Sequence, residues 1–365
     1  MNNSRVRYID TWRFFAIALV IISHIIEFSH PIYRETFPGL IWRIHPLGRL
    51  GVHIFFCLSG YVICRGMMNE VARSGSLSMR DFYFRRVCRI FPPLFLYLLL
   101  LALMTAAGII DMSIAQFTQS ALFLCNIEML GGCGWYAAHT WSLAYEEQFY
   151  LIFPMLFVGL AIARKRRKLL NVIGVLIAIV LLAHLAGQPA LAYYLSIFNY
   201  MLWGCAFALY EHKAAPLLKR MPVALWYAGC AVLLGVNFIA LPALLMEVVY
   251  PLAAPLIICA VVFGTPLHQR PIGKLFGFPF LAYLGQISYT IYLWQQAATK
   301  DHGFASPLVV FGFLGFVFVL AHFSYKYVEI PLIRLGRRLS RHEGTVPTST
   351  PAQVNEISLG QLSRD

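Results

Sequence analysis

Long apolar runs, each about twenty residues in length, follow one another along nearly the whole chain. Short basic or Gly/Pro-containing segments separate them. An α-helix of that length crosses a bilayer, whereas the strands of a membrane β-barrel would alternate polar and apolar positions. The pattern therefore predicts an all-α integral membrane protein built as a bundle of about ten transmembrane helices. The expected spans are 12–29, 48–64, 91–110, 145–163, 169–187, 190–210, 222–241, 243–263, 280–298 and 306–326.

The basic residues predict the orientation of this bundle. With the N-terminus inside, 25 of the 29 lysines and arginines fall in cytoplasmic segments or at their membrane edge. Membrane proteins carry such an excess on the cytoplasmic side, so both termini are expected to be cytoplasmic. The same bias accounts for the net charge of +13 without a nucleic-acid partner. The four basic residues left outside are Arg34, Arg43, Arg49 and Lys300.

Composition supports the membrane location. Hydrophobic residues make up 59% of the chain and charged residues only 12%, about half the charged share of a soluble domain. We expect the first span to be retained, because its apolar run continues without a small-residue cleavage site. The sequence thus predicts one transmembrane domain, 1–339, and a disordered cytoplasmic tail, 340–365, which is rich in Ser, Thr, Pro and Gln.

The eight cysteines are scattered along the chain. Six lie in or beside expected spans, where a cysteine serves as a small apolar packing residue. Cys125 and Cys133 fall in the outer loop 111–140, and an oxidising bacterial exterior permits a disulfide between them. No Cys/His spacing resembles a zinc site, so no metal is expected.

Arg13 and His24 lie within the first expected span, which is otherwise almost wholly apolar. An arginine at membrane depth costs roughly 2.5–3.5 kcal/mol, so ionisable groups there usually have a function. Eleven residues make about three helical turns, so the two side chains share one helix face, roughly 16 Å apart along the axis. One helix therefore aligns a cation near the cytoplasmic surface with a titratable base deeper in the membrane.

The second expected span contains the segment GVHIFFCLSGY, residues 51–61. Close packing of its small residues explains most of this segment, and only His53 falls outside that explanation. Ser59 and Tyr61 are its other polar candidates. The segment by itself does not separate packing from function.

A cationic patch precedes the third expected span, in the segment FYFRRVCRIFPP at 82–93. Arg85, Arg86 and Arg89 lie three or four residues apart and would share one helix face. Such a patch binds lipid headgroups, and it fits the phosphates of a cytosolic nucleotide-bearing substrate equally well, because arginine matches phosphate geometry.

The outer loop leads into the segment HTWSLAYEEQFYLIFP at 139–154. Its aromatic residues suit simple anchoring at the membrane interface, whereas two adjacent carboxylates at the start of an apolar run favour a functional role. A further carboxylate, Glu329, stands next to a membrane end near the C-terminus, where it is either solvated or functional. The candidates in the segment are Trp141, Ser142, Glu146 and Glu147.

These motifs, together with GQISYTIYLW at 285–294 and SYKYVEIP at 324–331, occur in one order along residues 8–335. In register, they resemble the membrane acyltransferase-3 family, the bacterial integral-membrane O-acyltransferases of surface glycans. The resemblance implies a ten-helix bundle in the bacterial inner membrane, with residues 1–339 as the acyltransferase domain. It also implies transfer of an acyl group, usually acetyl, from cytosolic acyl-CoA to a hydroxyl of a glycan or lipid-linked glycan. Lipopolysaccharide O-antigen and exopolysaccharide are such acceptors, and acyl-CoA is a co-substrate rather than a bound cofactor.

The resemblance assigns roles to particular residues. Acyl transfer from a thioester to a hydroxyl needs a base, a donor for the developing oxyanion and positioned substrates. His24 is the expected base, and Arg13 is expected to position acyl-CoA or to pair with a carboxylate. Glu146 is expected to orient His24 or the acceptor sugar, with Glu27, one turn beyond His24, as the rival partner. Arg85, Arg86 and Arg89 are the candidates for the CoA phosphates.

Three positions depart from the family pattern. His53 stands where the family usually has Asp, so any role of that Asp is altered here. Gln295 follows the YLW segment where the family often has His, which weakens a catalytic role carried over to that position. Tyr145 replaces a small or β-branched residue, a change we expect to be tolerated.

Two alternatives remain open at this level. A covalent acyl-enzyme on Ser59 or a cysteine would split the transfer into two steps, but nothing nearby in the sequence activates either group. A transporter or flippase of a glycolipid or acyl donor would also suit ten spans and intramembrane charges, although no inverted repeat is visible. A structural membrane subunit has little reason to bury Arg13 and His24.

Overall fold

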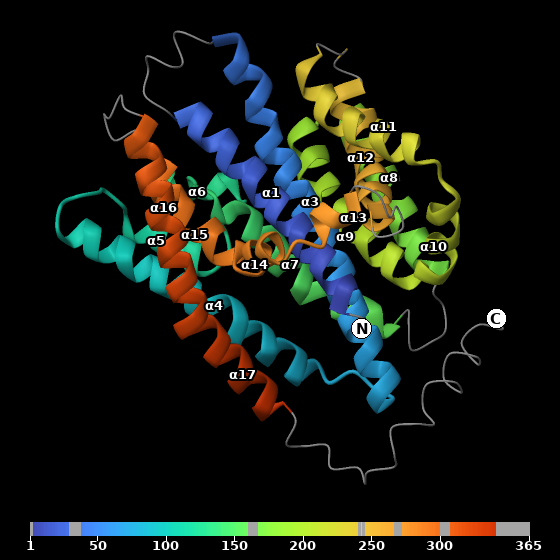
Figure 1. The fold of residues 1–365 in the computed structure, drawn as a ribbon, viewed down its shortest axis with the longest axis horizontal. Helices are drawn as coiled ribbons and strands as arrows, with labels where there is room; N and C mark the ends of the chain where they lie inside the picture. Colours follow the sequence, from blue (N-terminus) through green and yellow to red (C-terminus); the bar gives the residue numbers. More distant parts are fainter. Residues whose placement is uncertain are drawn as a thin grey trace.

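The computed structural model describes residues 3–28, 38–159, 167–239, 242, 245–265, 272–299 and 307–340. Every regular element in these residues is helical, as the sequence predicts (Figure 1). Of the expected tail, 340–365, the structure describes only Ser340, and residues 341–365 lie outside the described residues. The helices are α1 (Asn3–Phe28), α3 (Pro38–Ser74), α4 (Met79–Ala106), α5 (Ile114–Ala121), α6 (Gly134–Ala138), α7 (Thr140–Phe157), α8 (Arg167–Leu185), α9 (Pro189–Leu209), α10 (Glu211–Arg220), α11 (Val223–Gly235), α12 (Tyr250–Gly264), α13 (Ile272–Phe276), α14 (Pro279–Gln286), α15 (Ser288–Thr299), α16 (Pro307–Ser324) and α17 (Ile330–Leu339), with short turns η1 (Glu128–Leu130), η3 (Val236–Phe238), η4 (Leu245–Val249) and η6 (Tyr325–Glu329).

Five helices in the described residues are long and apolar enough to cross a membrane, or six if one bent pair counts as a single span. They coincide with five of the ten expected spans, so the remaining count and the side of the termini stay predictions. Two apolar helical segments are shorter, Leu170–Leu185 within α8 and Tyr250–Gly264, which is α12. The five segments are Arg7–Ile26, Arg43–Ser74, Met79–Ala106, Pro189–Leu209 and Phe311–Leu339.

The expected span 280–298 is not a single helix, because it is broken at Ile287 into α14 and α15. Hydropathy counts apolar residues without registering the direction of the helix axis, which explains why it appears continuous in the sequence. A bend of 104° separates α10 from α11, just before the expected span 222–241.

The third span starts earlier than the sequence predicts. Pro92 and Pro93 lack backbone N–H groups and favour a helix boundary, yet α4 runs without a break through both. In an α-helix these prolines leave the carbonyls of Cys88 and Arg89 without their usual N–H donors, which a membrane helix tolerates where neighbouring groups replace them. Tyr289 of α15 packs on the same turn and donates to the next carbonyl, that of Ile90, at 2.8 Å. The basic segment thus belongs to the spanning helix itself.

Helices α1 and α3 run side by side through the centre of the molecule (Figure 1). Their approach is close, because a Cβ on Gly48 would lie only 2.7 Å from Ser23 Oγ. The two chain directions are opposite, so Gly48 marks the level of His24 on the neighbouring helix. Helix α9 packs on the other side of α3, and α14 and α15 pack on α1.

Cys125 and Cys133 form a disulfide in the segment between α5 and α7, the pairing that the sequence left open. The bond closes a short loop whose far end leads directly into α6. This segment therefore has a covalent tie in addition to its packing.

Candidate functional site

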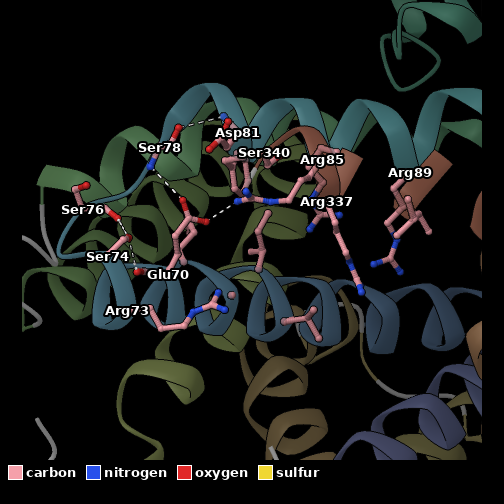
Figure 2. A pocket seen from close by; sticks show the side chains of 17 residues that line it. Glu70, Arg73, Ser74, Ser76, Ser78, Asp81, Arg85, Arg89, Arg337 and Ser340 are labelled. Atoms are coloured by element: carbon pink, nitrogen blue, oxygen red, sulfur yellow. Dashed lines mark hydrogen bonds and ion pairs between the residues drawn. The ribbon is translucent and has the colours of Figure 1, made fainter. Parts of the chain in front are cut away.

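A cavity of about 980 Å³ opens between α3, α4 and α17, at the end of the bundle that the sequence predicts to be cytosolic (Figure 2). We call it the arginine cavity. Its polar lining is mainly guanidinium groups, with two carboxylates and several serines. The charged residues that line it are Glu70, Arg73, Asp81, Arg85, Arg86, Arg89 and Arg337.

A tight turn brings the two long helices around this cavity together. Helix α3 ends at Ser74, and the next residue, Gly75, has a φ of +75°, a conformation that other residues rarely adopt. Ser78 then caps α4, accepting a hydrogen bond from the Asp81 N–H at 3.3 Å. Across the turn, Glu70 accepts from Arg85 at 2.5 Å and from the Ser78 N–H at 3.1 Å (Figure 2).

A smaller cavity of about 60 Å³ lies deeper in the bundle. Arg86 and Arg89 line both cavities, so guanidinium groups connect the arginine cavity to this deeper space. The clustering of Arg85, Arg86 and Arg89 around open space agrees with their predicted grouping on one helix face. The other polar residues of the small cavity are Arg13, Ser59, Glu146, Glu147, Tyr150 and Tyr289.

Carboxylates and cations are interleaved around the small cavity. Ser59 donates to Glu146 Oε1 at 2.7 Å, and Tyr150 donates to the other oxygen at 3.4 Å. The Arg86 guanidinium lies over the Tyr150 ring, 3.9 Å from its centroid. Arg13 is an electrostatic neighbour of Glu146, which agrees with the alternative that Arg13 pairs with a carboxylate.

His24 lies in a second polar region, toward the opposite end of α1. Its Nδ1 is 3.0 Å from Oε1 of Gln295, a residue of α15 with no exposed surface. Gln295 Nε2 donates to Gln296 Oε1 at 3.4 Å, and Gln296 Nε2 donates to the Trp135 backbone carbonyl at 2.9 Å. We call His24, Gln295, Gln296 and the Trp135 carbonyl the glutamine chain.

The expected contact between Glu146 and His24 does not form. Gly48 lies at the level of His24, and Ser59, the partner of Glu146, is eleven residues further along α3. At 1.5 Å per residue, these two polar regions are roughly 16 Å apart along the helix. The sequence predicts that Glu146 and His24 both lie toward the outer half of the membrane. In the structure, Glu146 lies almost two turns after the start of α7, and this places it at the level of Ser59. The side chain of Glu27, the rival partner, lies outside the described residues.

Ser142 belongs to the His24 region. It shares a 2.7 Å hydrogen bond with the Tyr292 hydroxyl, and Tyr292 also donates to the His139 backbone carbonyl at 2.6 Å. His139 is buried, and its ring packs edge-on against the Tyr292 ring with centroids 5.2 Å apart. A second imidazole therefore lies next to the His24 region.

The other candidates occupy structural positions. His53 is buried, stacks on Tyr200 with ring centroids 4.1 Å apart, and has no hydrogen-bond partner at either ring nitrogen. Tyr61 donates to Glu211, which also forms an ion pair with Arg65.

Trp141 and Glu329 are the remaining candidates. Trp141 packs edge-on against the Tyr145 ring, so the unusual Tyr145 is accommodated by aromatic packing. Glu329 is buried and accepts a hydrogen bond from Thr290, which excludes the idle, solvated alternative.

Sequence reasoning missed four residues of these regions. Arg73 and Arg337 line the arginine cavity, and Arg337 reaches it from α17, far away in the sequence. Gln295 was identified only as a departure from the family pattern, and Gln296 not at all. Two adjacent glutamines within an apolar helix were the available signal, because buried amides need partners. Within the described residues, no three His, Cys, Asp or Glu side chains are grouped to hold a metal.

The model of the family described as "Acyltransferase domain" matches residues 6–328. The putative peptidoglycan O-acetyltransferase YrhL of Bacillus subtilis is 28% identical, over 86% of this chain and 55% of its own length. The peptidoglycan O-acetyltransferase OatA of Listeria monocytogenes is 27% identical, over 79% and 52% respectively. A putative O-acetyltransferase of Staphylococcus aureus is 25% identical, over 79% and 53%. The chain thus spans about half the length of these relatives, and no solved structure matches significantly.

Proposed function

This chain belongs to the acyltransferase-3 family, and from that premise we propose that it is a membrane O-acyltransferase of a cell-surface glycan. The donor is acyl-CoA, most simply acetyl-CoA, taken from the cytosolic side of the bacterial inner membrane. The observation that carries the proposal is the arginine cavity, which leads through Arg86 and Arg89 to a buried polar space.

The arginine cavity fits the donor. CoA carries phosphate groups, and arginine forks bind phosphate through paired, charge-assisted hydrogen bonds. Five arginines from three helices line a cavity of about 980 Å³, a size typical of small-molecule sites. A bilayer-facing lipid patch would not need this enclosure, so the geometry favours a bound phosphate-bearing ligand over general attraction to headgroups.

His24 fits the acceptor. In the proposed reaction, the imidazole takes the proton of the glycan hydroxyl, and the hydroxyl oxygen bonds to the thioester carbonyl carbon. The C–S bond then breaks, and the proton passes on to the leaving CoA thiolate. The acyl group, carried on the flexible arm of CoA, has to cover the roughly 16 Å that separates the small cavity from His24.

The acceptor class follows from the relatives. The three relatives reported above are named as O-acetyltransferases, and two of those names specify peptidoglycan as the acceptor. A glycan hydroxyl presented on the outer side is therefore the proposed acceptor, with peptidoglycan, O-antigen and exopolysaccharide as the candidates to test.

A specific contact favours one variation in the route. Ser59 Oγ donates to Glu146, so a carboxylate base is in place beside a hydroxyl in the small cavity. In this two-step route, Glu146 takes the Ser59 proton, the serine oxygen bonds to the acyl carbon, and CoA leaves with that proton. In the second step the glycan hydroxyl oxygen bonds to the acyl carbon, the bond from that carbon to Ser59 Oγ breaks, and the hydroxyl proton passes through Glu146 to Ser59 Oγ.

The deciding experiment measures release of free CoA thiol from acetyl-CoA by the purified protein, with and without glycan extracts. We expect glycan-dependent release that disappears in His24→Ala and persists in His212→Ala, a histidine exposed on α10. Absence of thiol release from a folded protein with any acyl-CoA would favour transport instead. An acetyl group on Ser59, detected by mass spectrometry after mixing with acetyl-CoA alone, would establish the two-step route.

A further inference from the structure

The glutamine chain has one fixed end. The Trp135 backbone carbonyl can only accept a hydrogen bond, so the group of Gln296 that faces it must be the amide NH₂. The oxygen of Gln296 then faces Gln295, and only an NH₂ group of Gln295 can donate to it. The oxygen of Gln295 is therefore the atom that faces His24.

The orientation of Gln295 determines which nitrogen of His24 carries the proton. Gln295 Oε1 can only accept, and it lies 3.0 Å from His24 Nδ1. A neutral imidazole has one N–H and one lone pair, so a proton on Nδ1 leaves the lone pair on Nε2. The tautomer is thus set by a chain of three hydrogen bonds that ends on the backbone.

We propose that Gln295 and Gln296 are positioning residues that hold His24 as the Nδ1–H tautomer, with Nε2 as the basic atom. The proposal deepens the function above and rests on it where it concerns catalysis. During transfer, Nε2 takes the proton from the glycan hydroxyl, and Gln295 Oε1 stabilises the Nδ1–H of the resulting imidazolium. A neutral amide does this without placing a second charge at membrane depth.

Burial makes the arrangement rigid. Gln295 has no exposed surface and Gln296 is 2% exposed, so neither amide can turn to water for an alternative partner. Reversing one amide would set two donors or two acceptors against each other, which is costly for buried groups. The disulfide-linked segment that supplies Trp135 fixes the last acceptor in place.

The tautomer can be measured directly by ¹⁵N NMR of histidine-labelled protein in lipid nanodiscs. At about pH 8, imidazole is mainly neutral, and the His24 signals are those that vanish in His24→Ala. We expect a protonated Nδ1 and an unprotonated Nε2. The reverse assignment would overturn the proposal, whether or not the protein transfers acyl groups, so this result stands apart from a failure of the proposed function.

Variants test the chain of partners. Gln295→Met keeps the volume but removes the acceptor, so we expect a mixed tautomer and a fall in kcat of about 10- to 100-fold, with the KM for acyl-CoA unchanged. Gln295→Glu still presents an acceptor to Nδ1 but loses the donor to Gln296 Oε1, so it should keep the Nδ1–H tautomer with a lower midpoint of thermal unfolding than the wild type. Gln296→Met should have a smaller effect of the same kind.

The matched control is Gln286→Met, which removes a glutamine that bonds Asp10 near the other end of α1. It should leave both the His24 signals and kcat unchanged. Two outcomes overturn the proposal: a Gln295→Met protein with the wild-type tautomer, or one with the wild-type kcat.

Discussion

In the arginine cavity, guanidinium groups from α3, α4 and α17 surround open space, whereas around His24 buried amides and a backbone carbonyl satisfy one another in a closed chain. The first arrangement leaves positive charge available, which suits a polyanionic ligand that must enter and leave. In the second arrangement, the polar groups hold the His24 side chain in one orientation, which suits a chemical step. In the proposed function, donor binding and chemistry are therefore separated along one helix, with Arg13 toward one end and His24 toward the other.

The largest expected effect comes from removing the base. His24→Ala should lower kcat about 10²- to 10⁴-fold, because general-base catalysis contributes a factor of that size. Binding of acyl-CoA to the arginine cavity should be unchanged, since His24 is roughly 16 Å away from Ser59 along the helix. Thiol release and equilibrium binding, measured on the same preparation, check both parts. A parallel loss of acyl-CoA binding would mean that His24 also contributes to donor binding, and it would contradict the separation of the two regions.

Arg89→Met tests the other region. Arg89 lines both cavities, and a hydrogen bond to a charged group is worth about 1.5–3 kcal/mol, so we expect acyl-CoA to bind about 10- to 100-fold more weakly. At saturating donor, kcat should stay near the wild-type value. The control is Arg338→Met, an exposed arginine of α17 that lines neither cavity. A lowered kcat with unchanged affinity would place Arg89 with the chemistry instead.

Removing the disulfide should affect only the His24 region. The bond closes a loop of eight residues, for which the entropic contribution to stability is about 2–3 kcal/mol. In the double variant Cys125→Ser and Cys133→Ser, the segment carrying the Trp135 carbonyl is less constrained. We expect a lower midpoint of thermal unfolding and a few-fold lower kcat, with acyl-CoA affinity as in the wild type. Weakened donor binding would contradict the separation of the regions.

The smallest effect is expected from Glu70→Gln. Glu70 pairs with Arg85 at the edge of the arginine cavity and competes there with a ligand phosphate. The pair is partly exposed, with 32% of the Arg85 side chain and 18% of the Glu70 side chain accessible. Solvent therefore screens it, and we expect acyl-CoA affinity to rise only about two- to fivefold. Asp111→Asn, an exposed carboxylate of the outer segment, is the control. Weaker binding would mean that Glu70 chiefly positions Arg85 for the ligand.

Much of the architecture was predictable, because it depends on local sequence properties. Apolar runs identified the long helices, and helical periodicity aligned Arg13 with His24 on one helix. The predicted start of the third span at residue 91 was too late, because hydropathy excludes the arginines of 85–89 from a span although they belong to the same continuous helix α4. The break at Ile287 was missed because hydropathy carries no information on the direction of a helix axis.

By itself, the sequence determined the class of protein, the helical elements, the position of the arginine patch and the family to which the chain belongs. The tertiary structure decided the partners: Glu146 with Ser59 rather than His24, Gln295 with His24, and Arg337 with the arginines of α4. The physical reason is that periodicity places residues on a face of their own helix, whereas side-chain partners depend on how helices distant in sequence pack and at what level they meet. A buried polar group has to find a partner somewhere, but only the packed fold determines which one.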